Sequence, residues 1–202
     1  MVNPFIGRID RRYYRTDKLK ITFMTNIAQA TRYTVTPGQK NFRPIENPKP
    51  RCCDGFRLTA RFEPSCWWPE TPANKKQRER WMKLKGFTHF FGRNNYRSVM
   101  IAFRPGKLEG VMEVIAYTND KKGNWKTTGN PVEVFVEQVF DASCNLQGKR
   151  AHYTITSFGN TTLCAHPWDA HWLKIYREVG TWINEPGAVQ DMALEVDFQM
   201  IK

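Results

Sequence analysis

The sequence predicts an all-β protein folded as an antiparallel two-sheet sandwich, and three observations lead to this fold class. Apolar and polar residues alternate along many short segments that are rich in β-branched and aromatic residues, as half-buried strands require. Clusters of Gly, Pro, Asn and Asp separate these segments where turns are expected. A chain of 202 residues fits one such sandwich, in which each half-buried strand is covered by a facing sheet. We therefore expect a single domain over residues 1–202, with residues 1–18 as a basic N-terminal arm.

The expected strands differ in how their apolar residues are arranged. Residues 99–103 are apolar throughout, which indicates a strand buried on both faces. Residues 108–118 place Val111 and Tyr117 on one side and Val114 on the other. The same reasoning predicts strands at residues 19–25, 56–62, 132–137, 152–156, 172–176 and 192–198. Turn residues stand at 37–38, 104–106, 119–124, 145–148, 159–160 and 186–187.

One segment breaks the alternation. Residues 72–84 are rich in helix formers, and their apolar residues gather in the last turn. We therefore expect one or two short surface helices, the clearest at about residues 73–84. The Pro-rich residues 37–54 and 63–73 predict extended, irregular arms.

The sequence also suggests where the chain is made. It contains no apolar run with the length of a membrane span, and Arg8 and Arg11 stand where a signal peptide would carry its apolar stretch. The five cysteines, an odd number without regular spacing, favour reduced thiols. We therefore expect synthesis in a cytoplasm and no membrane partner.

The net charge of +12 is concentrated in one half of the chain. Residues 1–107 carry 23 Lys and Arg against 7 Asp and Glu, whereas residues 108–202 carry 8 against 12. This asymmetry predicts a basic face and an anionic partner, which could be a nucleic acid, a nucleotide, an acidic glycan or an acidic protein surface. The alternative is a solvated basic surface without a dedicated ligand. The N-terminal part of the basic surface is expected at Arg8, Arg11, Arg12 and Arg15.

A resemblance to a known family covers roughly residues 86–200. It is carried by Gly86-Phe87, Asn95-Tyr96-Arg97-Ser98-Val99, the run from Gly110 to Tyr117, Gly180-Thr181-Trp182 and the run from Ala188 to Met192. In these features the chain resembles a family of proteins encoded by phages of gut Bacteroidetes. The resemblance implies a concanavalin-like jelly-roll sandwich, similar in shape to lectins and to polysaccharide-acting domains.

Catalytic constellations are incomplete in this sequence. Glu133 and Glu137 share one strand face, as do Glu195 and Asp197, but a glycan hydrolase needs two carboxylates facing each other across the sugar. His152 begins one His-x-Thr copy, whereas two-histidine phosphoesterases carry two. The Cys and His residues lack the paired spacing of zinc sites. We therefore expect no catalytic residue, no metal and no cofactor.

The stretch from Trp67 to Arg97 is the best candidate for a binding site, because it combines aromatic residues with Arg and Lys. Aromatic faces and cations together hold a sugar ring, a base or a nucleotide by stacking and by ion pairing. The alternative is that the aromatic residues belong to the core and the Arg side chains flank them. The ligand-binding residues predicted are Trp67, Trp68, Trp81, Arg93, Tyr96 and Arg97.

These observations favour a phage-encoded, non-enzymatic binding protein, with a virion or assembly component preferred to a lectin-like glycan binder. Its neighbours would be virion proteins or further copies of the chain, and its location the host cytoplasm during infection or the virion. One alternative is a cytosolic anti-defence protein that sequesters an anionic nucleotide or blocks a host protein. The other is an enzyme that cleaves a glycan or a phosphodiester.

Overall fold

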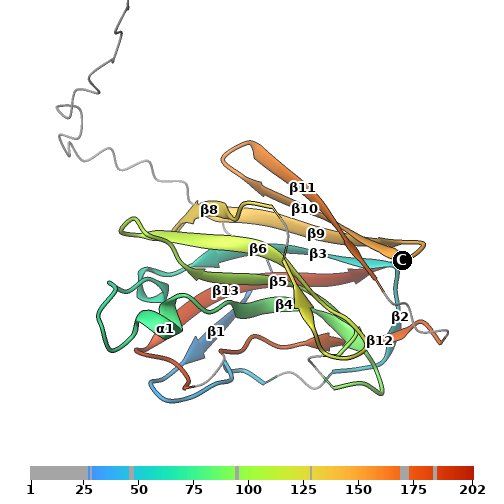
Figure 1. The fold of residues 1–202 in the computed structure, drawn as a ribbon, viewed down its shortest axis with the longest axis horizontal. Helices are drawn as coiled ribbons and strands as arrows, with labels where there is room; N and C mark the ends of the chain where they lie inside the picture. The colour runs from blue at the N-terminus through green and yellow to red at the C-terminus, as the bar shows by residue number, and fades with distance from the viewer. Residues whose placement is uncertain are drawn as a thin grey trace, which may run out of the picture.

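The protein is a sandwich of two antiparallel β-sheets in the computed structural model (Figure 1), which describes residues 27, 29–45, 48–93, 96–127, 129–168, 173–183 and 186–202. The six-stranded sheet has the spatial order β1 (Thr31–Val35), β13 (Met192–Ile201), β3 (Gly55–Phe62), β9 (Val139–Gln147), β10 (Arg150–Ser157), β11 (Asn160–Pro167). The seven-stranded sheet has the order β2 (Arg51–Cys52), β12 (Ile175–Val179), β4 (Met82–His89), β5 (Ser98–Pro105), β6 (Val111–Asn119), β7 (Trp125–Lys126), and β8 (Val132–Phe135) also pairs with β6.

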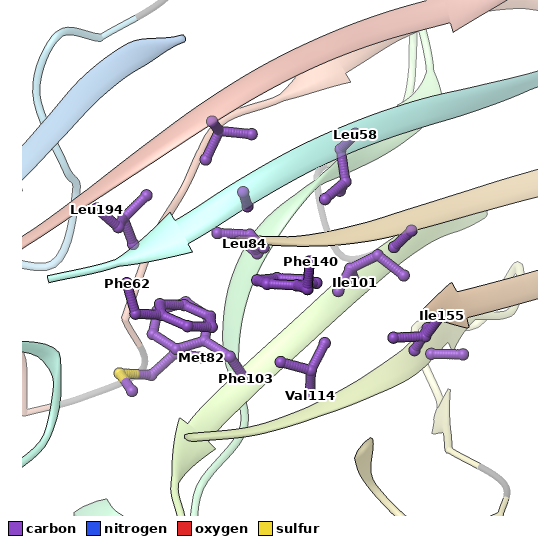
Figure 2. Close-up of a cluster of buried hydrophobic side chains, with 14 of the residues drawn as sticks. Leu58, Phe62, Met82, Leu84, Ile101, Phe103, Val114, Phe140, Ile155 and Leu194 are labelled. Atoms are coloured by element: carbon purple, nitrogen blue, oxygen red, sulfur yellow. The ribbon is translucent and has the colours of Figure 1, made fainter. Parts of the chain in front are cut away.

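The main core lies between the two sheets, where alternate residues of facing strands meet. Phe62 of the six-stranded sheet packs against Phe103 and Phe140, with ring centroids 5.0 and 5.4 Å apart. Figure 2 shows these rings among aliphatic side chains that both sheets contribute. This core fixes the two sheets relative to each other, so the side chains on their outer faces stand on a rigid support.

Most of the predicted strands are confirmed. Residues 99–103 lie in β5, which is buried almost throughout, and residues 108–118 lie largely in β6 with the predicted alternation. The predictions at residues 56–62, 132–137, 152–156 and 192–198 fall on β3, β8, β10 and β13. The strand predicted at 172–176 is observed as β12, which begins later, at Ile175. The strand predicted at 19–25 and the basic arm lie outside the described residues, and the single domain over residues 1–202 stays a prediction.

The predicted helix is shorter than the sequence suggested. Helix α1 covers only Lys75–Arg78, and a short 3-10 helix covers Pro64–Cys66. Residues from Met82 onward belong to β4, because Met82 and Leu84 both point into the core and alternate with Lys83. The helix prediction was wrong for residues 82–84, because pairing with β5 outweighs the local preference for a helix.

Strand β4 contains a bulge that sets the direction of two lysines. Its pairing with β5 shifts between Lys83 and Lys85. In a regular strand these two side chains would point to the same face, but an extra residue reverses the alternation. Lys83 therefore points to the outer face of the seven-stranded sheet, whereas the Lys85 amine lies 4.5 Å from the ring centroid of Tyr33, a core residue, and 2.6 Å from Glu178.

No helix within the described ranges is long and apolar enough to cross a membrane. The five cysteines are all described, and each carries a free thiol. Burial raises the pKa of the Cys53 thiol to about 12 and raises that of Cys66 further. These two thiols are therefore protonated and act as small apolar groups in the core.

Candidate functional site

The outer face of the seven-stranded sheet carries a second apolar cluster, separate from the main core. Its members come from β5, β6 and β12, and Trp81 and Trp182 pack against it from the loops. An outer sheet face is ordinarily solvated and polar, whereas this cluster is buried beneath Trp81 and Trp182, which are only partly buried and can themselves meet a ligand. We refer to the cluster and the tryptophan rings against it as the aromatic layer. The buried members are Met100, Ala102, Ile115, Tyr117 and Val179.

Lys83 stands at the centre of this layer and is only 3% exposed. Its Nζ lies 4.3 Å from the ring centroid of Tyr117 and 6.0 Å from that of Trp182, and it donates a hydrogen bond of 2.8 Å to the carbonyl oxygen of Trp81. Aromatic faces stabilise an ammonium only in part, and burial lowers the pKa of Lys83 to about 8. We refer to Lys83 and Tyr117 as the lysine site.

Tyr117 is the second ionisable group of the lysine site. Burial raises the pKa of its phenol to about 12, so the phenol carries its proton at any ordinary pH. Its ring stacks on Trp125 of β7 with centroids 5.9 Å apart and an angle of 11° between the planes. Trp125 is 60% exposed, so it is the accessible edge of the aromatic layer.

The layer continues toward both ends of β4. At one end the guanidinium of Arg104 lies 4.2 Å from the ring centroid of Trp81 and its Nε donates to Glu113 at 2.6 Å. At the other end Asn119 follows Tyr117 on the same face of β6 and donates to the hydroxyl of Ser98 at 2.8 Å. Aromatic, cationic and amide groups thus follow one another along a single face.

A cavity of about 370 Å³ opens at the rim of the sandwich, beside the Asn119 end of this face. It is formed by the end of β4, the loop from β4 to β5 and the turn after β6. We refer to it as the rim pocket, and it is lined by His89, Gly92, Arg93, Tyr96, Arg97 and Lys121.

The predicted ligand-binding residues divide into three groups. Arg93, Tyr96 and Arg97 meet in the rim pocket. Trp81 belongs to the outer aromatic layer, and Trp67 lines a different cavity beside Arg78, whose guanidinium carbon is 5.2 Å from its ring centroid. Trp68 is 2% exposed inside the main core, so its ring packs against protein rather than facing solvent.

The residues considered for other chemistry do not converge. Glu133 and Glu137 are exposed, and Glu195 is paired with Arg61 at 2.7 Å. His152 lies on β10 in the six-stranded sheet, away from the lysine site. Within the described ranges no three His, Cys, Asp or Glu residues are placed to hold a metal ion.

Sequence reasoning missed the lysine site and the two tryptophans beside it. The composition of residues 73–84 predicts a helix at Lys83. The bulge that turns the Lys83 side chain to the outer face leaves no clear pattern in the sequence. Trp125 and Trp182 lie far from Lys83 along the chain and approach it only through the sheet. One signal was available, because Tyr117 and Asn119 are alternate residues on a face that the strand pattern already separated from the core.

Neither a family model nor a curated protein matches this sequence. The fold, however, is that of the concanavalin-like jelly-roll sandwiches. The alginate lyase from Klebsiella pneumoniae is similar at a TM-score of 0.50 and 11% identity, over 73% of this chain and 60% of that chain. The exolytic PL7 alginate lyase from Zobellia galactanivorans is similar at a TM-score of 0.55 and 8% identity, over 86% of this chain and 85% of that chain.

These similarities confirm the fold class and correct the functional expectation. A non-enzymatic virion or assembly component was predicted because every catalytic constellation in the sequence was incomplete. Structures with this fold include polysaccharide lyases, which contradicts the preference for a non-enzyme. An incomplete constellation of carboxylates, histidines or cysteines in the sequence therefore did not exclude an enzyme.

Proposed function

We propose that the protein cleaves an acidic polysaccharide, a polymer of uronic acids, by elimination on the outer face of the seven-stranded sheet. The observation that carries the proposal is the buried amine of Lys83, which has a pKa lowered to about 8 and lies against the protonated phenol of Tyr117. In active sites, the general acid and the general base are typically two neighbouring groups whose surroundings move their pKa values apart.

The aromatic layer suits the sugar rings of such a polymer. The apolar face of a sugar rests on flat aromatic side chains, and Trp125, Trp182 and Trp81 offer these along one face. The net charge of +12 favours a polyanion and speeds its association by long-range attraction. The alginate lyases named above share the fold, and alginate itself is a polyuronate, which supports the same substrate class.

Elimination makes limited demands on the site. A base removes the proton on the carbon next to the carboxylate, the bond to the leaving oxygen breaks, and an acid gives that oxygen a proton. In the neutral form Lys83 is suited to the base, and Tyr117 is suited to the acid. Hydrolysis would need two free carboxylates facing the sugar, whereas Glu113 on this face is held by Arg104.

Access to Lys83 depends on the aromatic layer. Because Lys83 is 3% exposed, a substrate reaches its amine only when part of this layer moves. Trp125 is the side chain best placed to move, since it is 60% exposed and stands on a strand of two residues. A base that meets substrate only after water has been displaced keeps its lowered pKa.

The proposal is tested by incubating the full chain with alginate, polygalacturonate and hyaluronan and measuring the ultraviolet absorbance of the unsaturated product. We expect turnover of at least one polymer, with loss of about a hundredfold or more in Lys83→Met and Tyr117→Phe. The control is Lys85→Met, which removes a lysine that faces the core. Absence of unsaturated product from all three polymers, or turnover unchanged in Lys83→Met, would contradict the proposal.

The phage origin and the location in a host cytoplasm or virion stay predictions, because they rest on the sequence alone. They are compatible with an enzyme that acts on an acidic bacterial polysaccharide. The anionic partner expected from the charge asymmetry becomes, in this proposal, the substrate.

A further inference from the structure

The rim pocket differs from the other cavities in its charge. Its lining contains the cations Arg93, Arg97 and Lys121 together with His89, and no acidic residue. The cavity beside Trp67, by contrast, is lined by Glu70, Glu79 and Glu113 as well as by three basic side chains: Arg78, Arg104 and Lys107. A pocket whose charged lining residues are all cations attracts and holds an anion.

The acidic residue nearest in sequence to the rim pocket is engaged elsewhere. The Oδ1 of Asp120 accepts hydrogen bonds from the backbone N–H groups of Lys122 at 2.7 Å and Asn124 at 2.9 Å, and Oδ2 accepts one from the Asn124 amide. These hydrogen bonds lower the pKa of Asp120, the largest effect coming from Asn124. The carboxylate therefore holds its own turn and leaves Lys121 free to face a ligand.

The described residues on both sides of positions 94 and 95, which carry most of the pocket lining, are held in place at several points. Arg177 of β12 donates to the carbonyl oxygens of Gly92 at 2.8 Å and Phe90 at 3.2 Å. The hydroxyl of Thr88 donates to the carbonyl oxygen of Tyr96 at 2.7 Å. The backbone N–H of Arg97 donates to the carbonyl oxygen of Asp120 at 2.9 Å. The pocket is thus built before any ligand arrives, which lowers the entropy cost of binding.

Arg97 has an unusual backbone conformation. Its φ is +45°, in the left-handed region that residues other than glycine, asparagine and aspartate rarely occupy. Its Nε is buried and has no hydrogen-bond acceptor among the residues that the structure describes. Strained backbone and unsatisfied donors gather at binding sites, where a ligand supplies the missing acceptor.

We propose that the rim pocket is an anion subsite that binds the acidic group, a carboxylate or a sulfate, of a sugar residue next to the lysine site. The guanidinium of Arg97 grips the two oxygens of the group as a fork, and Arg93 and Lys121 neutralise it. Tyr96, which is 36% exposed, and Phe91, which is 72% exposed, offer ring faces to the sugar. The carbohydrate part of this inference rests on the proposed function.

The position of the pocket fits one ligand that spans both sites. Tyr117 and Asn119 are two residues apart on β6, about 7 Å along an extended strand, and Lys121 follows in the turn. A chain of a few sugars on the aromatic layer therefore reaches the pocket with its next acidic group. The pocket would then fix the position of the polymer relative to Lys83.

The test measures binding of three short oligosaccharides of equal length by calorimetry: a uronic-acid chain, its carboxyl-reduced neutral form, and a sulfated neutral chain. The variant is Arg93→Gln with Arg97→Asn, since asparagine tolerates the left-handed conformation at position 97. The matched control is Arg57→Gln with Lys49→Gln, which removes the same charge from the six-stranded sheet and from the segment before β2.

We expect the variant to bind the uronic-acid or the sulfated chain at least about tenfold more weakly, at an unchanged melting temperature, while the control binds as the unaltered chain does. Whichever charged chain loses affinity identifies the acidic group. The proposal would be overturned if the variant and the unaltered chain bound both charged ligands with equal affinity. It would also be overturned if the unaltered chain bound the neutral form as tightly as the charged ones. Loss of binding in the variant without any unsaturated product would uphold the subsite and reject the elimination.

Discussion

Replacing Lys83 by methionine should make the protein more stable at neutral pH and inactive at the same time. Burial lowers the pKa of Lys83 from 10.5 to about 8, so below pH 8 the folded protein carries a buried ammonium that the unfolded chain carries in water. A difference of this size corresponds to roughly 3 kcal/mol. The contacts of the ammonium with the rings of Tyr117 and Trp182 offset about 1 kcal/mol of this destabilisation. We expect Lys83→Met to raise the free energy of unfolding by about 1–3 kcal/mol at pH 7.

The pH dependence of the stability gain distinguishes removal of a buried ammonium from improved packing by methionine. Between pH 8 and 10.5 the unfolded chain binds a proton at this lysine and the folded chain does not, so the stability of the unaltered protein rises with pH over this window. The gain from Lys83→Met should therefore shrink as pH rises from 8 to 10. Urea unfolding of both proteins at pH 7, 8.5 and 10 measures it. A gain that is the same at all three pH values, or a loss at pH 7, would refute the account of Lys83.

Three further pairs of substitutions test the packing and electrostatics of the sandwich. Gly86→Ala places a Cβ atom 2.1 Å from the carbonyl oxygen of Val99 and should cost about 3 kcal/mol, whereas Gly180→Ala, with open space around it, should be nearly neutral in the same denaturation assay. Burial lowers the pKa of His166 to about 4, so stability should fall by roughly 3 kcal/mol between pH 6.5 and 4, and His166→Gln should flatten that fall while His152→Gln leaves it. Trp68→Ala should cost about 3–5 kcal/mol of stability, whereas Trp125→Ala should keep the melting temperature and weaken uronic-acid oligosaccharide binding about two- to tenfold; a stability loss as large in Trp125→Ala as in Trp68→Ala would show that Trp125 is structural.

The sequence predicted the parts of the fold in which local pattern and tertiary structure agree. Strands β5 and β6 are apolar on both faces, because one face of each lies in the main core and the aromatic layer covers the other. The predicted helix at about residues 73–84 instead ran into the first three residues of β4, a strand that pairs with β5 in the structure. Local preference was therefore overridden by pairing with distant residues.

The candidate site could be predicted only in part for the same reason. Arg93, Tyr96 and Arg97 are close in sequence and meet in the rim pocket, so a local reading of the aromatic and basic stretch was sufficient. Lys83, Tyr117 and Trp182 come from three separate segments. Their meeting depends on the strand order and on a one-residue bulge, and neither has a reliable signature in a single sequence.

The most direct test of the account is a crystal structure of the Lys83→Met variant with a uronic-acid oligosaccharide. We expect the sugar rings on Trp125 and Trp182, one glycosidic bond beside Tyr117, and an acidic group in the rim pocket against Arg97. An oligosaccharide bound instead on the outer face of the six-stranded sheet, or in the cleft beside Tyr33 and Glu178, would contradict the central claim that this face of the seven-stranded sheet is the active site.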